Sequence, residues 1–291
     1  MAALPAADIR RAVRQGLEED LGQGDVTTSA LFTSAVPARA NIIAQQPLVV
    51  AGMTAAIQTF VTVDPLLSFS VLRKDGSQAK NGETLLRIEG DGRSILMAER
   101  VALNFLQHLS GIATLTHRFC QAVRGYPVAI LDTRKTLPGW RALQKWAVAL
   151  GGGMNHRRSL GDGILIKDNH LVLLNQKEAV REASRLAKIA APTGMPTIVE
   201  VESLKEVTQA LAGQADIILL DNMTPAMVKK AVRLINKRAL VEVSGGINLN
   251  NVRAMAAAGP DRISIGALTH SAPAATISLE LYPSSKGRRK R

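Results

Sequence analysis

The sequence lacks the features that mark secreted, membrane-spanning or base-stacking proteins. Among 291 residues there is one cysteine, Cys120, so no disulfide can form within the chain and we expect a cytoplasmic setting. No run of about 18 uncharged apolar residues occurs, so we expect no membrane-spanning helix, and early charged residues argue against a signal peptide. Aromatic residues make up 3% of the chain, which leaves few platforms for stacking bases.

The formal net charge of +12 is concentrated in two segments. Residues 134–167 hold seven Lys/Arg against one acidic residue, and the tail 286–291 adds five more cations, while the rest of the chain is close to neutral. A basic protein can bind nucleic acid, but no nucleic-acid-binding motif accompanies these cations. We therefore regard nucleic-acid binding as the less favoured alternative and ask what the internal segment binds.

The sequence pattern of residues 1–125 predicts a mixed α+β domain. Apolar residues at four-residue spacing predict a helix over 6–21, and a longer pattern predicts a helix over 94–123 that is interrupted near Ser110 and Gly111. The other expected elements are a helix at 54–63 and strands at 38–46, 71–72 and 85–88.

Short apolar runs alternate with helical patterns over residues 126–269. At least six such units are typical of a parallel sheet, either open or closed into a barrel, and periodicity does not separate these two folds. We expect residues 270–285 to pack back on the first domain and treat 286–291 as a separate basic tail. The predicted strands lie at 128–131, 163–166, 197–201, 217–220, 240–243 and 262–265, and the predicted helices at 174–190, 204–212, 225–235 and 249–258.

Polar residues follow the C-terminal end of each predicted strand. In α/β barrels the active site is built at that end. One or two such residues would be explained as helix N-caps. Polar residues at the ends of six consecutive predicted strands instead favour one shared site. In chain order the groups are Asp132–Lys135, Lys167–His170, Glu200 and Glu202, Asp221 and Asn222, Ser244–Gly246, and Gly266 and Ala267.

The cations of this set point to a ligand with several negative charges. They would repel one another in one pocket unless an anion bound there, and arginine grips planar carboxylates and phosphates with paired hydrogen bonds. Two carboxylates, Glu200 and Asp221, come from adjacent strands and could take Mg²⁺ carried by a phosphorylated substrate, or stabilise a developing positive charge. A salt bridge to a neighbouring Lys or Arg is the alternative for each. The cations are Arg134, Lys135, His156, Arg157 and Lys167.

Glycine runs add a candidate phosphate site. Ser244-Gly245-Gly246 lies between a predicted strand and a predicted helix, where backbone N–H groups can bind a phosphate, and Gly266 could complete that cradle. Gly151-Gly152-Gly153 is either a flexible loop that delivers the following cations or a plain helix C-cap. Dinucleotide, P-loop, zinc-ligand and serine-nucleophile motifs do not occur in the sequence.

Several strings of residues resemble the quinolinate phosphoribosyltransferase family. The most specific are Leu131–Gly139 (LDTRKTLPG), Gly151–Arg157 (GGGMNHR) and Leu165–His170 (LIKDNH). The resemblance extends in order over about residues 8–281. It implies an α/β protein with an N-terminal α+β sandwich-like domain and a C-terminal incomplete α/β barrel of six or seven parallel strands. It also implies a homodimer in which the partner chain completes each active site.

The resemblance also implies an activity and its residues. Family members transfer phosphoribose from 5-phosphoribosyl 1-pyrophosphate to quinolinate with decarboxylation and with Mg²⁺, giving nicotinate mononucleotide, pyrophosphate and CO2 for NAD biosynthesis. The quinolinate carboxylates would be held by Arg134, His156, Arg157 and Lys167, and by Arg100 of the partner chain. The catalytic residues would be Lys135, Lys167, Glu200 and Asp221, with Lys135, Glu200 and Asp221 facing the phosphoribosyl pyrophosphate and its Mg²⁺. The 5-phosphate would be held by Ser244, Gly245, Gly246 and Gly266.

Two alternatives stay open at this point. A paralogue with the same fold would use another pyridine or anionic acceptor, and a nucleic-acid-binding protein would use the tail 286–291. The sequence departs from the family pattern in that tail and at Trp140, Trp146 and Arg158. We interpret Arg158 as a solvated side chain.

Overall fold

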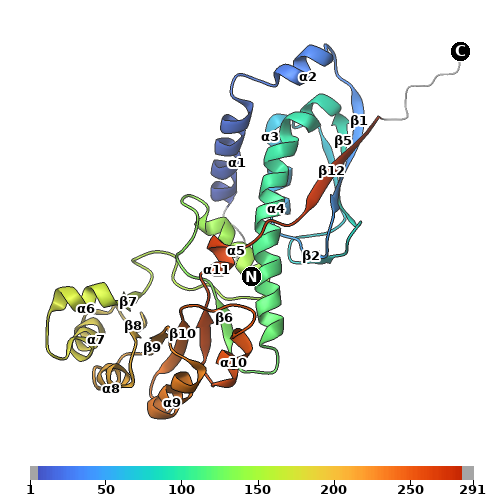
Figure 1. The fold of residues 1–291 in the computed structure, drawn as a ribbon. Helices are drawn as coiled ribbons and strands as arrows, with labels where there is room; N and C mark the ends of the chain where they lie inside the picture. Colours follow the sequence, from blue (N-terminus) through green and yellow to red (C-terminus); the bar gives the residue numbers. More distant parts are fainter. Residues whose placement is uncertain (1–5, 284–291) are drawn as a thin grey trace, which may run out of the picture. The chain divides into compact units, whose positions relative to one another are not determined.

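The computed structural model describes residues 6–283, which form two compact units (Figure 1). The first unit comprises the chain up to His117, the segment Leu137–Gly152 and the chain from Ala272 onward. The second comprises Arg118–Thr136 and Gly153–Ser271. The predicted basic tail 286–291 lies outside the described residues. No helix between residues 6 and 283 is long and apolar enough to cross a membrane.

The first unit is built on a four-stranded antiparallel sheet. Its strand order is β12 (Ile277–Pro283), β1 (Pro37–Ala44), β5 (Thr84–Asp91) and β3 (Ser68–Val71). A second, two-stranded sheet pairs β2 (Leu48–Val49) with β4 (Gln78–Ala79). The helices are α1 (Ala6–Leu21), α2 (Val26–Leu31), α3 (Met53–Val63), α4 (Gly92–Ala122, its last residues in the second unit) and α5 (Arg141–Leu150).

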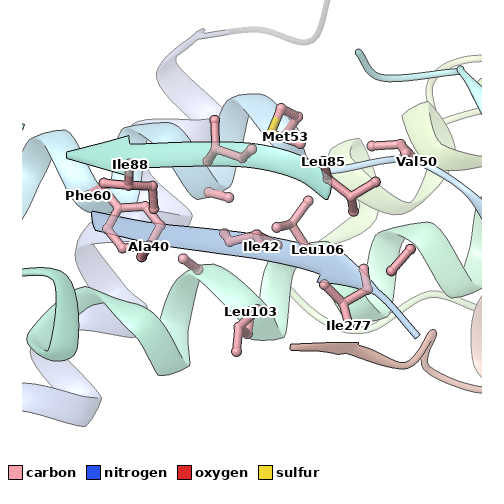
Figure 2. Close-up of a cluster of buried hydrophobic side chains, with 14 of the residues drawn as sticks. Ala40, Ile42, Val50, Met53, Phe60, Leu85, Ile88, Leu103, Leu106 and Ile277 are labelled. Carbon is pink, nitrogen blue, oxygen red and sulfur yellow. The ribbon is translucent and has the colours of Figure 1, made fainter. Parts of the chain in front are cut away.

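The core of the first unit combines residues of this sheet with residues of α3 and α4 (Figure 2). Alternate residues of β1, among them Ala40 and Ile42, are buried, as expected when one face of a strand is covered. Phe60 of α3 and Leu106 of α4 belong to the same cluster and are fully buried. Burial of each large apolar side chain contributes about 1.5–3 kcal/mol to stability.

Helix α4 is continuous through Ser110 and Gly111, so the predicted interruption there is wrong. The Ser110 hydroxyl accepts a hydrogen bond from the backbone N–H of Ala51 at 3.0 Å and donates one to its carbonyl at 3.1 Å. A Cβ added at Gly111 would overlap the carbonyl oxygen of Pro273. These two small residues therefore allow neighbouring backbone to approach the helix and do not mark its end.

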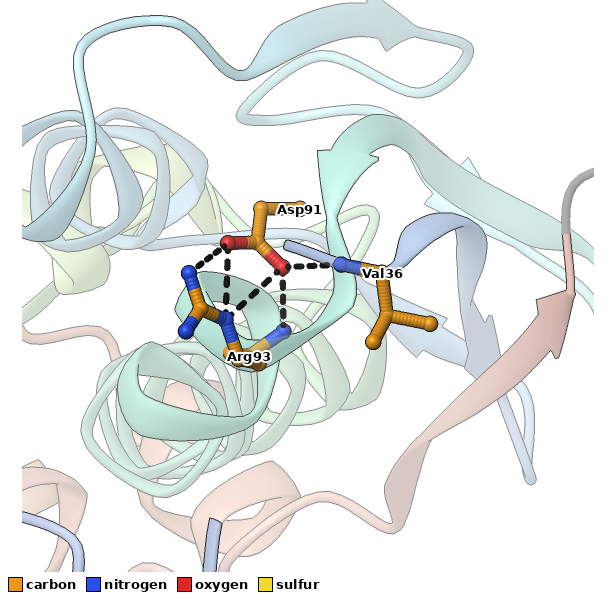
Figure 3. A network of polar contacts seen from close by, with 3 residues as sticks. All are labelled: Val36, Asp91 and Arg93. Atoms are coloured by element: carbon orange, nitrogen blue, oxygen red, sulfur yellow. Dashed lines mark hydrogen bonds and ion pairs between the residues drawn. The ribbon is translucent and has the colours of Figure 1, made fainter. Parts of the chain in front are cut away.

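Asp91 holds the junction between β5 and α4 (Figure 3). Its carboxylate accepts hydrogen bonds from the backbone N–H groups of Val36 at 3.0 Å and Arg93 at 3.1 Å, and pairs with the Arg93 guanidinium at 2.9 Å. Burial acts to raise the pKa of Asp91, but the hydrogen bonds from Arg93 and Val36 outweigh it and hold the pKa below its ordinary value. The ionised carboxylate therefore stabilises this junction.

The second unit is built on six parallel strands, which confirms the predicted alternation of strands and helices. Met154 adds a parallel bridge to Leu131 at the β6 edge, in the position of a seventh strand. The strand order is β6 (Ala129–Leu131), β11 (Arg262–Ser264), β10 (Leu240–Ser244), β9 (Ile217–Asp221), β8 (Thr197–Val201) and β7 (Ile164–Ile166). The helices are α6 (Asp168–Leu174), α7 (Ala179–Ala190), α8 (Leu204–Ala212), α9 (Pro225–Ile235), α10 (Val252–Ala257) and α11 (Ala267–His270).

Local signals explain most helix boundaries of this unit. Helix α8 starts after Ser203, whose hydroxyl accepts from the Glu206 N–H while the Glu206 carboxylate accepts from the Ser203 N–H. The predicted helix over 174–190 is wrong in its first part, because Asn175 adopts a left-handed conformation (φ 48°) that ends α6, and α7 begins at Ala179. The apolar residues of helix α6 form one short run, 171–174, which is too short to show helical periodicity, and none of its residues is buried.

Candidate active site

A cavity of about 290 Å³ lies at the C-terminal ends of the parallel strands in the second unit. Eight side chains that the sequence predicts for one site line it together: Arg134, Lys135, His156, Arg157, Lys167, Glu200, Asp221 and Ser244. The remaining lining residues are Thr133, Leu165, Leu219, Glu242 and Ser264. Residues from five of the six strands, and from the segments that follow them, therefore meet in one place.

The other four predicted residues are not part of this wall. Gly245 and Gly246 directly follow Ser244, and Gly266 lies so close to Lys135 that an added Cβ would be 2.9 Å from its Cδ. Arg100 lies on α4, within the part of the helix that belongs to the first unit, and its side chain is exposed.

Strand pairing arranges the cavity side chains in rows. Glu200 of β8 pairs with Leu219 of β9, and Leu219 pairs with Glu242 of β10. Two residues further along, Asp221 pairs with Ser244. Because side chains two residues apart share a face of a strand, both rows face the same cavity. Glu242 was missed by our sequence reasoning, and its place two residues before Ser244 is the signal that could have revealed it.

Two guanidinium groups lie near each other in the cavity. Burial, and then the positive charge of Arg134, lower the pKa of Arg157. Nη1 of Arg157 donates a hydrogen bond to the carbonyl of Gly163 at 2.8 Å, which fixes the side chain. Its Nε is buried and has no hydrogen-bond partner within residues 6–283. A ligand with more than one negative charge would satisfy this group and relieve the repulsion.

A lysine and two carboxylates form the neighbouring part of the wall. Nζ of Lys167 lies 2.9 Å from Oε2 of Glu200, which is the salt bridge that the sequence left open as an alternative for Glu200. Burial, and then the negative charge of Glu200, raise the pKa of Asp221, while Lys167 acts in the opposite direction. Nδ2 of Asn222 donates to Oδ2 of Asp221 at 2.6 Å. A cation that reaches this wall would therefore meet two carboxylates.

The Gly245-Gly246 turn packs against the end of β9. Both glycines have positive φ, 85° and 62°, and a Cβ at Gly245 would overlap Oδ1 of Asn222. Successive backbone N–H groups in such a turn can bind an anion. The predicted helix does not begin beside these glycines, because α10 starts only at Val252. The turn, and not a helix N-terminus, is thus the candidate anion site.

The segment that carries His156 and Arg157 is tied to β6. The buried carboxylate of Asp132 accepts a hydrogen bond from the backbone N–H of His156 at 2.8 Å. Nδ1 of His156 accepts one from the backbone N–H of Arg157 at 2.7 Å, and its Nε2 lies 3.3 Å from Oε1 of Glu242. His156 and Arg157 are therefore positioned by two buried carboxylates, Asp132 directly after β6 and Glu242 on β10.

Residues at which the sequence departs from the family pattern lie outside the cavity wall. Trp140 stacks on Phe105 at 4.8 Å and meets His108 edge-on, within the first unit. Arg158 is exposed, as expected for a solvated side chain.

Gly151 forms the C-cap of α5, which matches the C-cap interpretation of the three-glycine run.

The described part of the chain contains no group of three or more His, Cys, Asp or Glu side chains that could hold a metal ion. Glu200 and Asp221 nevertheless line one wall of the cavity. Two carboxylates suit Mg²⁺ when phosphate oxygens of a substrate and water supply its other ligands. These residues therefore fit a metal ion that arrives with a phosphorylated ligand.

Two family models match consecutive parts of the chain. The model described as "Quinolinate phosphoribosyl transferase, N-terminal domain" matches residues 25–110. The model described as "Quinolinate phosphoribosyl transferase, C-terminal domain" matches residues 112–280, which include every residue of the cavity wall.

Similar proteins and solved structures cover nearly the whole chain. A nicotinate-nucleotide pyrophosphorylase [carboxylating] of Mycobacterium leprae is 41% identical over 278 residues, which are 94% of this chain and 96% of the relative. A probable enzyme of the same name from Methanocaldococcus jannaschii is 39% identical, over 93% and 96%. The structure of the nicotinate-nucleotide pyrophosphorylase from Francisella tularensis has a TM-score of 0.88 at 36% identity, over 96% and 98%. That of NadC from Streptococcus pyogenes has 0.89 at 37%, over 97% and 99%.

Proposed function

The chain belongs to the quinolinate phosphoribosyltransferase family, and we propose on this basis that the cavity of its second unit is the active site. The protein is a pentosyltransferase that transfers phosphoribose from 5-phosphoribosyl 1-pyrophosphate to quinolinate with decarboxylation. Its products are nicotinate mononucleotide, pyrophosphate and CO2, in NAD biosynthesis. The observation that supports the site assignment is the meeting of eight predicted side chains at the C-terminal ends of the strands.

The cationic side of the cavity suits quinolinate, which carries two adjacent carboxylates on a pyridine ring. Arg134 and Arg157 can each donate two hydrogen bonds to a carboxylate. Burial, and then repulsion from Arg134, lower the pKa of Arg157, and a bound dianion would offset both effects. We assign to this subsite Arg134, His156, Arg157 and Lys167.

The adjoining part of the cavity wall suits the phosphorylated sugar. Its polar side chains end strands β8, β9 and β10, and the Gly245-Gly246 turn offers backbone N–H groups to a phosphate. Gly266 lets Lys135 approach closely, because a side chain there would meet the lysine. We assign to this subsite Lys135, Glu200, Asp221, Ser244, Gly245, Gly246 and Gly266.

The first chemical step builds positive charge on the sugar. As the bond from C1 to pyrophosphate breaks, C1 takes on oxocarbenium character, and the ring nitrogen of quinolinate uses its lone pair to form the new bond. Glu200 and Asp221 stabilise this positive charge from a partly buried wall. Holding two anionic substrates in the correct orientation is the second contribution of the protein.

The second step breaks the bond between C2 and its carboxylate. Once it is alkylated, the ring nitrogen carries a positive charge and accepts the electron pair that remains at C2 when CO2 leaves. A proton then adds at C2. The substituted ring itself supplies this electron sink, so the role of the cationic wall is to hold the ring in place.

Magnesium fits the carboxylate wall, and we propose that Glu200 and Asp221 hold it, directly or through the substrate. When bound with the phosphorylated sugar, Mg²⁺ would offset negative charge on the departing pyrophosphate. The geometry of the wall supports this only with additional ligands from the substrate, since the described residues form no three-ligand group.

We propose a homodimer in which Arg100 of the partner subunit completes the quinolinate subsite. Arg100 is exposed and is not among the residues that line the cavity. The second unit also carries exposed apolar side chains that a partner would cover, among them Leu160 at 72%, Val172 at 74% and Leu173 at 86%. A cytoplasmic location stays a prediction from the single cysteine.

A coupled assay tests the function. Purified protein is given quinolinate and 5-phosphoribosyl 1-pyrophosphate, with and without Mg²⁺, and both CO2 and nicotinate mononucleotide are measured. We expect equal amounts of the two products, dependent on Mg²⁺. Parallel reactions with nicotinate and nicotinamide test the paralogue alternative, and pyrophosphate release with one of these acceptors but not with quinolinate would overturn the assignment.

A further inference from the structure

Glu242 is a buried carboxylate in the middle of β10, level with Leu219 of β9 on one side and Arg262 of β11 on the other. It lies between Val241 and Val243, and its side chain is 0% exposed. It lines the cavity, yet neither of its oxygens has a hydrogen-bond partner within the described residues. Burial of such a group is unfavourable unless a neighbouring cation or donor compensates it. A specific role for Glu242 is therefore expected.

The nearest polar group to Glu242 is His156, whose Nε2 lies 3.3 Å from Oε1. On the other side of the same ring, Nδ1 accepts a hydrogen bond from the backbone N–H of Arg157 at 2.7 Å. A ring nitrogen that accepts carries no proton, so the proton of the neutral imidazole lies on Nε2, facing the carboxylate. Both ring nitrogens of His156 thus contact protein groups.

We propose that Glu242 is a positioning residue for the quinolinate subsite and that it acts through His156. The inference rests on the proposed function of the cavity. The negative charge of the carboxylate, 3.3 Å from Nε2, favours the tautomer that carries its proton on Nε2, which leaves Nδ1 as the acceptor for Arg157. His156 then links a buried anion to the backbone of an arginine that binds substrate.

Two substitutions separate the effect of the charge of Glu242 from the effect of its shape. Glu242→Gln keeps the length of the side chain and an acceptor oxygen but removes the charge, whereas Glu242→Leu removes both. The matched control is Val241→Ala, which changes a buried residue of the same strand whose side chain faces away from the cavity.

The first measurement does not depend on activity. In protein labelled with ¹⁵N-histidine, at mildly alkaline pH, the native His156 signals are expected to show a protonated Nε2 and an unprotonated Nδ1. They are assigned by their loss in a His156→Gln variant. Glu242→Leu is expected to give a mixture of tautomers, while Val241→Ala keeps the native pattern. An unchanged tautomer in Glu242→Leu would overturn the proposal, even if quinolinate proved not to be the substrate.

The second measurement is kinetic. We expect Glu242→Leu to raise the KM for quinolinate by about 10- to 100-fold, as loss of an orienting partner commonly does, with little change in the KM for the phosphoribosyl donor. Glu242→Gln should fall between this variant and the native enzyme. Glu242→Leu removes one partner of a buried contact and should lower Tm. Val241→Ala should also lower Tm but leave both KM values unchanged, so the KM for quinolinate separates the two variants. Equal changes in both KM values, or a lowered Tm with unchanged KM values, would mean that Glu242 only supports the fold.

Discussion

Arg134 and Lys167 are the residues whose loss should affect quinolinate use most directly. Both line the cavity, and each would donate charged hydrogen bonds to a carboxylate. Since such a bond contributes about 1.5–3 kcal/mol, we expect Arg134→Ala or Lys167→Ala to lower kcat/KM for quinolinate by about 10- to 150-fold. The measurement is steady-state kinetics with quinolinate varied at saturating 5-phosphoribosyl 1-pyrophosphate.

Arg158→Ala is the matched control for these variants. Arg158 carries the same charge next to Arg157, but its side chain is exposed and does not line the cavity. We expect kinetics close to those of the native enzyme. Near-native turnover in both Arg134→Ala and Lys167→Ala would show that the cavity is not the quinolinate subsite.

Gly245 and Gly246 need to be glycine for different reasons. An added Cβ at Gly245 would overlap Asn222, which donates to Asp221, whereas at Gly246 it would meet nothing within 4 Å. Gly246→Ala therefore costs only the left-handed conformation, about 1–2 kcal/mol. We expect Gly245→Ala to lower kcat/KM for the phosphoribosyl donor about tenfold more than Gly246→Ala does. Kinetics and Tm of the two variants test this, and equal losses would mean that the contact with Asn222 is unimportant.

At the scale of elements, Asp91 connects β5 to α4 through its charge. We expect Asp91→Asn to lower the free energy of unfolding by about 1–2 kcal/mol at neutral pH, because the ion pair with Arg93 is lost. A carboxyl whose folded pKa is lowered contributes stability above its unfolded pKa and loses it as pH falls through the folded pKa. The difference between native and variant should therefore shrink below about pH 4. Urea unfolding at neutral and acidic pH measures it, and an undiminished difference in acid would exclude the charge as its cause.

The elements predicted well from sequence are those with a strong apolar pattern. Helix α1 and the six parallel strands follow from residues that alternate or recur at helical spacing. The errors occurred where a local pattern had another cause. Ser110 and Gly111 are small because backbone passes close to α4, and the apolar residues of α6 form one short run that is not buried. Neither the close approach of backbone to α4 nor the exposure of α6 can be predicted from the neighbouring sequence.

At the scale of the whole molecule, a shared active site makes a specific prediction. At quinolinate concentrations below KM, Arg100→Ala and Lys167→Ala should each retain only a small fraction of native activity as homodimers. If Arg100 acts in the site of the partner subunit, a mixed dimer holds one site with both substitutions and one native site. Random reassortment of the two variants should then restore about a quarter of native activity. Activity is measured after mixing, mild dissociation and reassociation.

The control for this experiment mixes two variants of the same wall, Lys167→Ala and Arg134→Ala. Both residues line the cavity of one chain, so a mixed dimer has one defect in each site and no native site. Recovery in this control as well, or no recovery with Arg100→Ala, would contradict a site completed by the partner.

The sequence by itself determined the chemistry of the ligand and the class of the fold. Half of the +12 charge lies in residues 134–167, and the polar groups recur at the ends of apolar runs, so an anion site on parallel strands could be predicted. Such patterns depend only on residues that are close in the sequence, so they can be recognised without knowledge of tertiary contacts.

Only the tertiary structure decided which side chains hold that site in place. In the sequence, Glu242 is a single charged residue within an apolar strand. In the structure, the pairing of β9 with β10 places its side chain in a row that faces the cavity, and Nε2 of His156 lies 3.3 Å from its Oε1. The same holds for Gly245, whose small size matters because Asn222 packs against it. These are contacts between segments distant in sequence, and their geometry depends on how the strands pair and not on local propensity.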